Sequence, residues 1–132
     1  MRILVADDHE PVRSCICEIL QAEGWQICGS ATNGSEAVEM AVRLKPDVLV
    51  MDISMPGLNG LDAARQLLKR TTQTNVVMVT MHETEPLMEA VLSLGASACV
   101  LKTDLQQLVA TIRTLAQSGH RHTQRLTRRS AR

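Results

Sequence analysis

PDVLVMDISMPGLNG, residues 46–60, is the stretch of sequence that decides the fold. The run VLVM at 48–51 has the length and composition of a strand covered on both faces, as strands of parallel sheets are. Asp52 follows this run directly, and a loop with Pro and Gly comes next. Because Asp is rare in strands and costly to bury alone, we expect its carboxylate to bind or to react at the end of a buried strand.

The same pattern recurs along the chain, where five short apolar runs alternate with five amphipathic segments of helical spacing. The runs are ILVA (3–6), QICGSA (26–31), VLVM (48–51), VVMV (76–79) and ACVL (98–101). Strict alternation of this kind predicts an α/β fold with a parallel sheet and helices on both of its faces. The second run is more polar than the others, which predicts an edge strand, and Ser35 is the expected N-cap of the helix that follows it.

Length, composition and charge divide the chain into a body and a tail. At 132 residues with 45% hydrophobic residues, the chain can form one globular domain with a buried core. Nine of the 14 basic residues and all 14 acidic residues fall in residues 1–117, so the body carries a charge of −5 and residues 118–132 carry +5. We expect a domain over 1–117 and a linker-like basic tail over 118–132.

Targeting signals and cysteine motifs are missing from the sequence. No apolar run is long enough to span a bilayer, and Arg2 interrupts the N-terminus too early for a signal peptide. We therefore expect a cytoplasmic protein without a membrane partner. The four cysteines, Cys15, Cys17, Cys28 and Cys99, form no CxxC pair and are expected to be buried, reduced thiols.

Polar residues stand where four of the five apolar runs end. They are Asp7 and Asp8, then Asp52, Thr80 and Lys102. In open α/β sheets, ligands bind beyond the carboxyl ends of the strands, at the point where the strand order reverses. If the order is 2-1-3-4-5, the first and third strands are neighbours there and the three Asp converge. Their carboxylates would repel one another unless a cation lies among them, and hard oxygen ligands with room for water suit Mg²⁺.

A divalent ion beside a carboxylate, a hydroxyl and an ammonium is the set of groups that phosphoryl transfer uses. Asp52 would be the covalent phosphoryl acceptor, Asp7 and Asp8 would hold the metal, and Thr80 and Lys102 would bind the phosphoryl oxygens. Each residue also has a plainer interpretation. Asp8 would cap a helix, Asp52 would form an Asx-turn, Thr80 would be an ordinary strand residue, and Lys102 would be a surface charge.

Four segments resemble the motifs of the response regulator receiver domain of two-component systems, over about residues 1–117. They are ILVADDHEPVR (3–13), VLVMDISMPGLNGLDAAR (48–65), VVMVTMHE (76–83) and GASACVLKTD (95–104). Within them, DDHEPVR, MPGLNGL and LKTD are more similar to the NarL/FixJ class, whose members usually carry a LuxR-type helix-turn-helix after the receiver. The resemblance implies a flavodoxin-like (βα)5 doubly wound parallel sheet with strand order 2-1-3-4-5.

The resemblance also implies the chemistry of the site. A sensor histidine kinase would phosphorylate Asp52, and Thr80 and Lys102 would recognise the phosphoryl group. Mg²⁺ would be bound by Asp8, Asp52 and the Ser54 carbonyl, with Asp7 acting partly through water. The protein would be a signalling receiver and not an enzyme, since it would catalyse only its own Mg²⁺-dependent phosphorylation and dephosphorylation.

In the resembled family, the receiver controls a DNA-binding output and thereby transcription. Phosphorylation would shift the surface of the fourth helix, fifth strand and fifth helix, and a homodimer would form through that surface or through the first helix. The tail segment LTRRSAR (126–132) resembles the opening of a LuxR-type DNA-binding domain. DNA would then be bound only through an output domain that this chain does not contain.

The sequence departs from the receiver pattern at Cys99 and Met81. Cys99 stands where receivers carry a switch aromatic, three residues before Lys102, and Met81 is larger than the usual Ala or Ser and is expected to narrow access to Asp52. Cys99 keeps open a pseudo-receiver that binds a partner without phosphorylation. A haloacid-dehalogenase-type phosphatase would need an acid where Ser54 stands, and a flavodoxin-like cofactor binder would need a Ser/Thr-rich loop where DDHEP stands.

Overall fold

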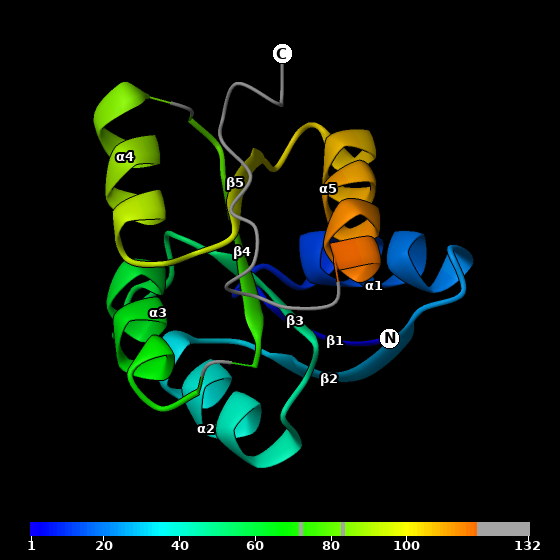
Figure 1. Cartoon of the computed structure of the whole chain (residues 1–132), viewed down its shortest axis with the longest axis horizontal. Coiled ribbons are helices and arrows are strands. Elements are labelled where there is room, and N and C mark those ends of the chain that lie inside the picture. The colour runs from blue at the N-terminus through cyan, green and yellow to red at the C-terminus, as the bar shows by residue number, and fades with distance from the viewer. Residues whose placement is uncertain (72, 83, 119–132) are drawn as a thin grey trace.

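Strands and helices alternate along the whole described chain (Figure 1), and the computed structural model describes residues 1–71, 73–82 and 84–118. The strands are β1 (Arg2–Ala6), β2 (Gln26–Ala31), β3 (Val48–Asp52), β4 (Asn75–Thr80) and β5 (Ala98–Leu101). The helices are α1 (Glu10–Ala22), α2 (Gly34–Leu44), α3 (Gly60–Leu68), α4 (Glu85–Ser93) and α5 (Leu105–Ser118). β3 and β4 each end one residue later than their apolar runs, because Asp52 and Thr80 still pair with the neighbouring strands.

All five strands pair in parallel, in the order β2-β1-β3-β4-β5. This order confirms the predicted flavodoxin-like, doubly wound (βα)5 sheet, and it places β2 at an edge, as the polar sequence of that strand predicts. β3 lies at the centre between β1 and β4, and all of its residues are buried. The strand order reverses between β1 and β3, so the ligand-binding edge of this fold lies at their carboxyl ends.

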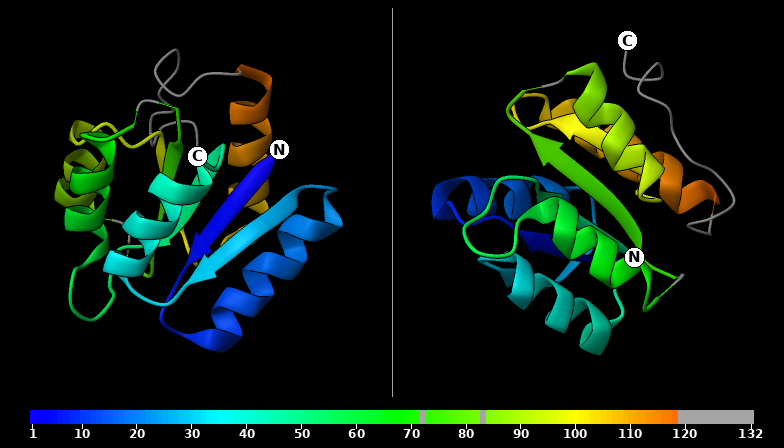
Figure 2. Two further views of the ribbon diagram at one scale, coloured as in Figure 1. Left: turned by 90° about the horizontal axis from the view of Figure 1, so that it is seen from below. Right: turned by 90° about the vertical axis from the view of Figure 1, so that its left-hand side faces the viewer.

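Helices cover both faces of the sheet. α1 and α5 lie on one face, and α2, α3 and α4 lie on the other (Figures 1 and 2). Side chains of β3 alternate between the two cores, so that Val50 belongs to the core that contains Ile112 of α5 and Met51 to the core that contains Leu67 of α3. Each such buried aliphatic side chain stabilises the fold by ~1.5–3 kcal/mol. This two-sided packing gives the strand ends, and the side chains on them, fixed positions.

The N-caps of two helices differ from the expectations. Asn33, not Ser35, caps α2, because its side chain accepts a hydrogen bond from the backbone N–H of Glu36 at 2.8 Å. The Glu36 carboxylate accepts the N–H of Thr32, the residue before the cap, at 2.6 Å, which further fixes the start of the helix. The N-cap of α1 is His9, so the interpretation of Asp8 as a helix cap is wrong.

The cysteines, the search for membrane helices and the C-terminal boundary bear on the remaining expectations. Cys99 is buried, but Cys15 is exposed on α1, so the prediction of buried thiols is wrong for Cys15. Within the described part of the chain, no helix has the length and apolar character needed to cross a membrane. The predicted boundary at residue 117 lies near the end of α5, and residues 119–132 lie outside the described residues. The basic tail, with its LTRRSAR segment, stays a prediction.

Candidate functional site: an acidic cluster at the carboxyl edge of the sheet

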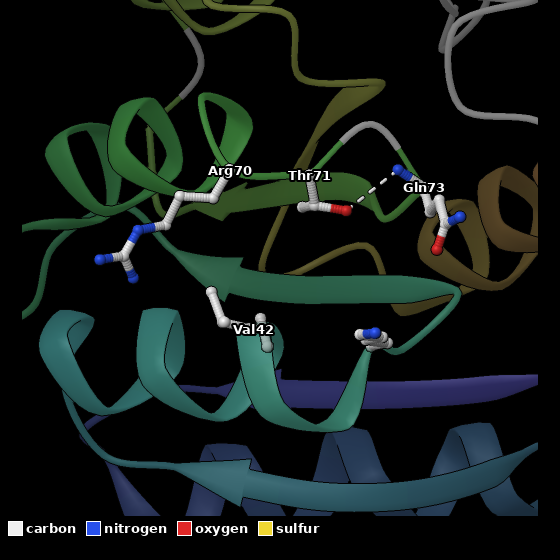
Figure 3. A pocket seen from close by; sticks show the side chains of 6 residues that line it. Val42, Arg70, Thr71 and Gln73 are labelled. Carbon is white, nitrogen blue, oxygen red and sulfur yellow. Dashed lines mark hydrogen bonds between the residues drawn. The ribbon is translucent and has the colours of Figure 1, made fainter.

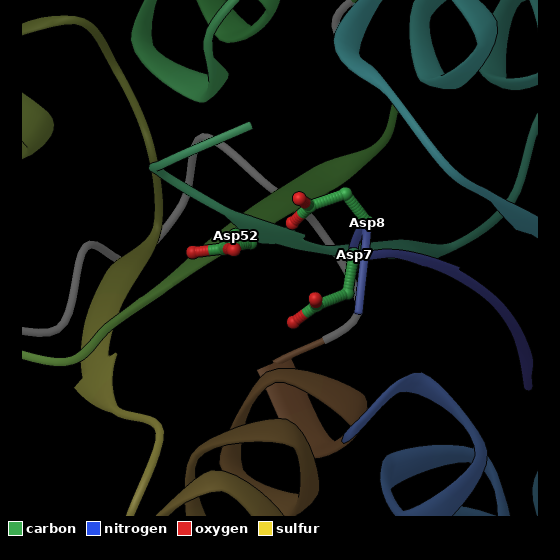
Figure 4. A group of neighbouring side chains, drawn as sticks. All are labelled: Asp7, Asp8 and Asp52. Carbon is green, nitrogen blue, oxygen red and sulfur yellow. The ribbon is translucent and has the colours of Figure 1, made fainter. Parts of the chain in front are cut away.

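The structure places all of the candidate side chains at the carboxyl ends of the strands. Asp7 and Asp8 follow β1, Asp52 ends β3, Thr80 ends β4 and Lys102 follows β5. One carboxylate oxygen from each of the three Asp lies within 4.8 Å of the others (Figure 4). The arrangement follows from the topology, because parallel strands bring their carboxyl ends to the same edge.

Backbone hydrogen bonds fix the position of Asp52. Asp52 pairs with Val79 of β4, and the next amide, that of Ile53, donates to the Val79 carbonyl at 3.0 Å. The loop then closes on itself, since the Gly60 N–H donates to the Ile53 carbonyl at 2.8 Å. A Cβ on Gly60 would lie 2.3 Å from the Asp52 carbonyl oxygen, so this approach of α3 to the strand end requires glycine.

An Asx-type contact is also present in this loop. The Ser54 N–H donates to Asp52 Oδ1 at 3.2 Å. The plainer interpretation of Asp52 as a turn residue is therefore met in part, but its other oxygen faces the acidic cluster and Lys102. Ser54 itself is exposed, two residues after Asp52 on the rim of the site.

The two Asp after β1 differ in their surroundings. Asp7 is fully buried; its N–H donates to the Ala31 carbonyl of β2 at 3.0 Å, and its Oδ1 accepts the His9 N–H at 2.8 Å. Asp8 is exposed at the mouth of the site. The cluster thus runs from a buried carboxylate at its base to a solvated carboxylate at its opening.

Lys102 neutralises part of the charge of the cluster. Its Nζ lies 2.9 Å from Asp7 Oδ2 and 3.1 Å from Asp52 Oδ2, and only 10% of its side chain is exposed. The interpretation of Lys102 as a surface charge is therefore wrong. Its backbone N–H donates to the Thr80 carbonyl at 2.7 Å, which anchors the end of β5 to β4 and directs the lysine into the site.

The charges of the site do not balance, since one ammonium faces three carboxylates. Burial raises the pKa of Asp52 above its ordinary value, and the Asp7 charge adds to this, although Lys102 acts in the opposite sense. Burial alone lowers the pKa of Lys102, but its contacts with Asp7 and Asp52 raise that pKa by more, so it stays protonated. Keeping these groups ionised in the folded state therefore costs free energy.

The donor set fits a hard divalent cation. Asp7 Oδ2 is buried and has no hydrogen-bond partner in the described structure, although the Lys102 ammonium lies close to it as an ion pair. Carboxylate oxygens left in this way, beside an exposed carboxylate, are ligands that Mg²⁺ prefers, with open positions for water. Asp7, Asp8 and Asp52 could hold such an ion, with room at the rim for the Ser54 backbone.

Thr80 and the two departures from the family pattern, Cys99 and Met81, lie on β4 and β5 or directly after β4. The Thr80 hydroxyl donates to the His82 carbonyl at 3.1 Å and accepts the His82 N–H at 3.2 Å, so it is bonded to the loop before α4. Cys99 is buried in β5, opposite Met78 of β4. Met81 is 56% exposed, directly after Thr80.

A pocket elsewhere on the surface has a different character. About 290 Å³ in volume, it lies between α2 and the segment that leads into β4 (Figure 3). This is the amino end of β4, whereas the acidic cluster lies at the carboxyl ends of the strands. Its lining is Ala41, Val42, Lys45, Arg70, Thr71 and Gln73. No carboxylate lines it, so the chemistry of the site belongs to the acidic cluster and not to this pocket.

One residue of the site has no role in the sequence-based prediction. Arg13 of α1 donates from its guanidinium Nη1 to the Asp7 carbonyl at 2.8 Å. It lies in the quoted motif DDHEPVR, but spacing alone does not show that its side chain turns back to the strand end.

Comparison with known proteins agrees with this geometry. The family model of the response regulator receiver domain matches residues 3–113. Response regulator GacA of Pseudomonas viridiflava is 40% identical over 124 residues, which cover 92% of this chain and 58% of GacA. This chain therefore spans little more than half the length of that relative.

Solved structures match over most of the described fold. A two-component response regulator of the LuxR family from Aurantimonas sp. SI85-9A1 superposes with a TM-score of 0.84 at 27% identity, covering 90% of this chain and 86% of that one. Response regulator TrrA from Thermotoga maritima, solved in complex with Mg²⁺ and BeF, has a TM-score of 0.78 at 30% identity, covering 86% and 97%.

The chain belongs to the response regulator receiver domain family, a family of signalling proteins. The predicted resemblance to the NarL/FixJ, LuxR-type class is confirmed as well, by the GacA relative and the LuxR-family structure.

Proposed function

We propose that the chain is a phosphoacceptor receiver, in which Asp52 accepts a phosphoryl group from a sensor histidine kinase and thereby switches a transcriptional output. The observation that carries the proposal is the cluster itself: three carboxylates within 4.8 Å, two of them in contact with one largely buried ammonium. Such an excess of carboxylates over ammonium groups does not stabilise the fold, because the negative charges are only partly balanced.

In the proposed reaction, an Asp52 carboxylate oxygen forms a bond to phosphorus while the bond from phosphorus to the donor, an imidazole nitrogen of the kinase or an acyl oxygen of acetyl phosphate, breaks. Asp52 is held ready for this by its strand pairing and by the Ser54 N–H. Lys102, already in contact with Asp52, compensates charge on the phosphoryl oxygens.

Mg²⁺, when bound, would neutralise charge on the carboxylates and on the phosphoryl oxygens. We assign Asp8, Asp52 and the Ser54 carbonyl as its ligands, with Asp7 acting partly through water. The neighbour TrrA, whose structure contains Mg²⁺ and BeF, supports this assignment. The burial of Asp7 and the exposure of Asp8 are consistent with it, since the ion would enter from the Asp8 side.

Thr80 would transmit the change. Its hydroxyl would leave the backbone of His82 and turn to the phosphoryl oxygens, which frees the loop before α4. A shift in that loop biases the surface of α4, β5 and α5, as a switch between two populated states requires. Cys99 is small and buried, so the rearrangement would proceed through Thr80 and the loop without a turning aromatic ring.

The wider role follows the relatives. A cytoplasmic receiver would control a LuxR-type output domain that binds DNA, by dimerising through α4, β5 and α5 or through α1. It would act as a signalling protein that catalyses only its own phosphorylation and dephosphorylation. The name of the relative GacA, a response regulator, and its greater length support such an output. No feature of the described residues favours the pseudo-receiver, which would not need the complete acidic cluster.

Incubation with Mg²⁺ and acetyl phosphate, followed by intact mass, tests the proposal. The wild-type chain should gain the mass of one phosphoryl group, and Asp52→Asn should gain none while keeping its melting temperature or raising it. An adduct of equal yield on Asp52→Asn would refute the assignment of Asp52. Absence of an adduct on the wild-type chain, together with absence of Mg²⁺ binding, would favour the pseudo-receiver.

A further inference from the structure

The motif DDHEPVR ends in a residue that the proposed reaction does not use. Arg13 lies in the first turns of α1 and is partly buried. Its Nη1 donates to the backbone carbonyl of Asp7 at 2.8 Å, across the turn that connects β1 to α1. The Arg13 guanidinium thus bonds to a neutral backbone carbonyl, although a cluster of carboxylates lies nearby. This contact holds the backbone and is not an ion pair.

The carbonyl in question belongs to the peptide between Asp7 and Asp8. The amide of Asp7 is fixed by β2, and its carboxylate is fixed by the His9 N–H. Because a peptide group is planar, a fixed Asp7 carbonyl also fixes the direction in which the backbone enters Asp8. Arg13 is therefore the contact that sets the orientation of this peptide on its carbonyl side.

Asp8 depends on this contact more than the other two acids do. Asp7 and Asp52 are buried, and Lys102 contacts both. The exposed carboxylate of Asp8 has no hydrogen-bond or ion-pair partner among the described residues. Its place within 4.8 Å of the other carboxylates is thus determined by its backbone.

We propose that Arg13 is a positioning residue of the metal site, which holds the Asp7–Asp8 peptide so that Asp8 can bind a divalent cation. The inference rests on the proposed function of the acidic cluster as a Mg²⁺ site. Groups that orient the ligands of a metal without touching it typically change its affinity by 10–100-fold when they are removed.

The sign of the effect separates positioning from charge. As a positive charge near the site, Arg13 repels a divalent cation, so its removal would tighten binding. As the anchor of the Asp8 backbone, it favours the bound geometry, so its removal would weaken binding. A residue that only fastens α1 to β1 would change the melting temperature and leave the dissociation constant unchanged.

The test measures the dissociation constant of Mn²⁺ by the EPR signal of the free ion, with Mg²⁺ as competitor, on the full chain. Arg13→Gln should weaken binding about tenfold. Arg13→Lys keeps the charge and can still donate one hydrogen bond. Its dissociation constant should lie between those of Arg13→Gln and the wild type. Arg43→Gln, an exposed arginine of α2, is the matched control and should bind as the wild type does.

A double-mutant cycle tests whether Arg13 acts through Asp8. Arg13→Gln should have little further effect on the dissociation constant in an Asp8→Asn background. Equal or tighter binding by Arg13→Gln than by the wild type would overturn the inference while leaving the proposed function intact. Absence of Mn²⁺ and Mg²⁺ binding by the wild-type chain would overturn both.

Discussion

Removal of the Lys102 ammonium should lower the stability of the metal-free protein. Its ammonium contacts Asp7, which is fully buried, and Asp52, which is 4% exposed. Lys102→Met keeps the length of the side chain and removes the cation, which leaves two buried carboxylates facing each other. Breaking a buried ion pair by removing one partner costs about 3–5 kcal/mol. Because the site opens to solvent at Asp8, we expect the lower end, about 3 kcal/mol.

Urea and thermal unfolding in EDTA at pH 7 measure this cost. For a domain of this size, about 4 °C of melting temperature corresponds to 1 kcal/mol, so Lys102→Met should melt about 12 °C lower. Lys69→Met, which removes an exposed lysine after α3, is the matched control and should stay within about 0.5 kcal/mol of the wild type. Millimolar Mg²⁺ should narrow the difference, since a cation would again lie among the carboxylates.

The pH dependence of the variant gives a second readout. Without the opposing effect of Lys102, burial and the neighbouring Asp7 charge raise the pKa of Asp52 in the folded state further above the unfolded value of about 4. A raised folded pKa means that the penalty is present at neutral pH and disappears as the pH falls toward the unfolded value. The difference between Lys102→Met and the wild type should therefore shrink on acidification. A difference below about 0.5 kcal/mol at pH 7 would show that Lys102 does not stabilise the buried carboxylates.

Three further predictions address the loop, the cap and the switch. Gly60→Ala forces a Cβ to within 2.3 Å of the Asp52 carbonyl oxygen. It should therefore lower the stability by more than about 1 kcal/mol and slow labelling by acetyl phosphate. Wild-type stability and a wild-type labelling rate in this variant would contradict the prediction. Asn33→Ala should cost about 1 kcal/mol in urea unfolding, whereas Ser35→Ala should cost almost nothing, and the reverse order would return the cap to Ser35. Thr80→Val should still be phosphorylated but should lose the change in amide exchange of α4, and an unchanged exchange response would exclude Thr80 as the transmitter.

Much of the fold is readable from the sequence because its determinants are local. VLVM followed by Asp52 predicts a buried central strand that ends in an acid, and the alternation of runs and amphipathic segments predicts the parallel sheet. The strand order then brings Asp7, Asp8 and Asp52 together, since parallel strands end at the same edge. The polarity of QICGSA similarly predicts the edge position of β2.

Details that depend on side-chain direction or on small local differences are not readable in the same way. Asn33 and Ser35 are both good caps, and only the backbone shows that Asn33 has the extended conformation that a cap needs. Cys15 is exposed on α1, although it stands next to the buried Ile16 in the sequence. The hydrogen bond between Lys102 and Asp52 joins residues 50 apart in the sequence, and that between Arg13 and Asp7 requires the side chain to turn back along α1.

Asp52 is the residue proposed to carry the phosphoryl group, and chemical trapping of the phosphorylated protein locates the modified residue. Protein treated with Mg²⁺ and acetyl phosphate is reduced with borohydride, which converts an aspartyl phosphate to homoserine, and peptides are then sequenced by mass spectrometry. We expect homoserine at position 52 and none at Asp7 or Asp8. Homoserine at either of those two acids, or at neither them nor position 52 despite a phosphoryl adduct in the intact mass, would contradict it.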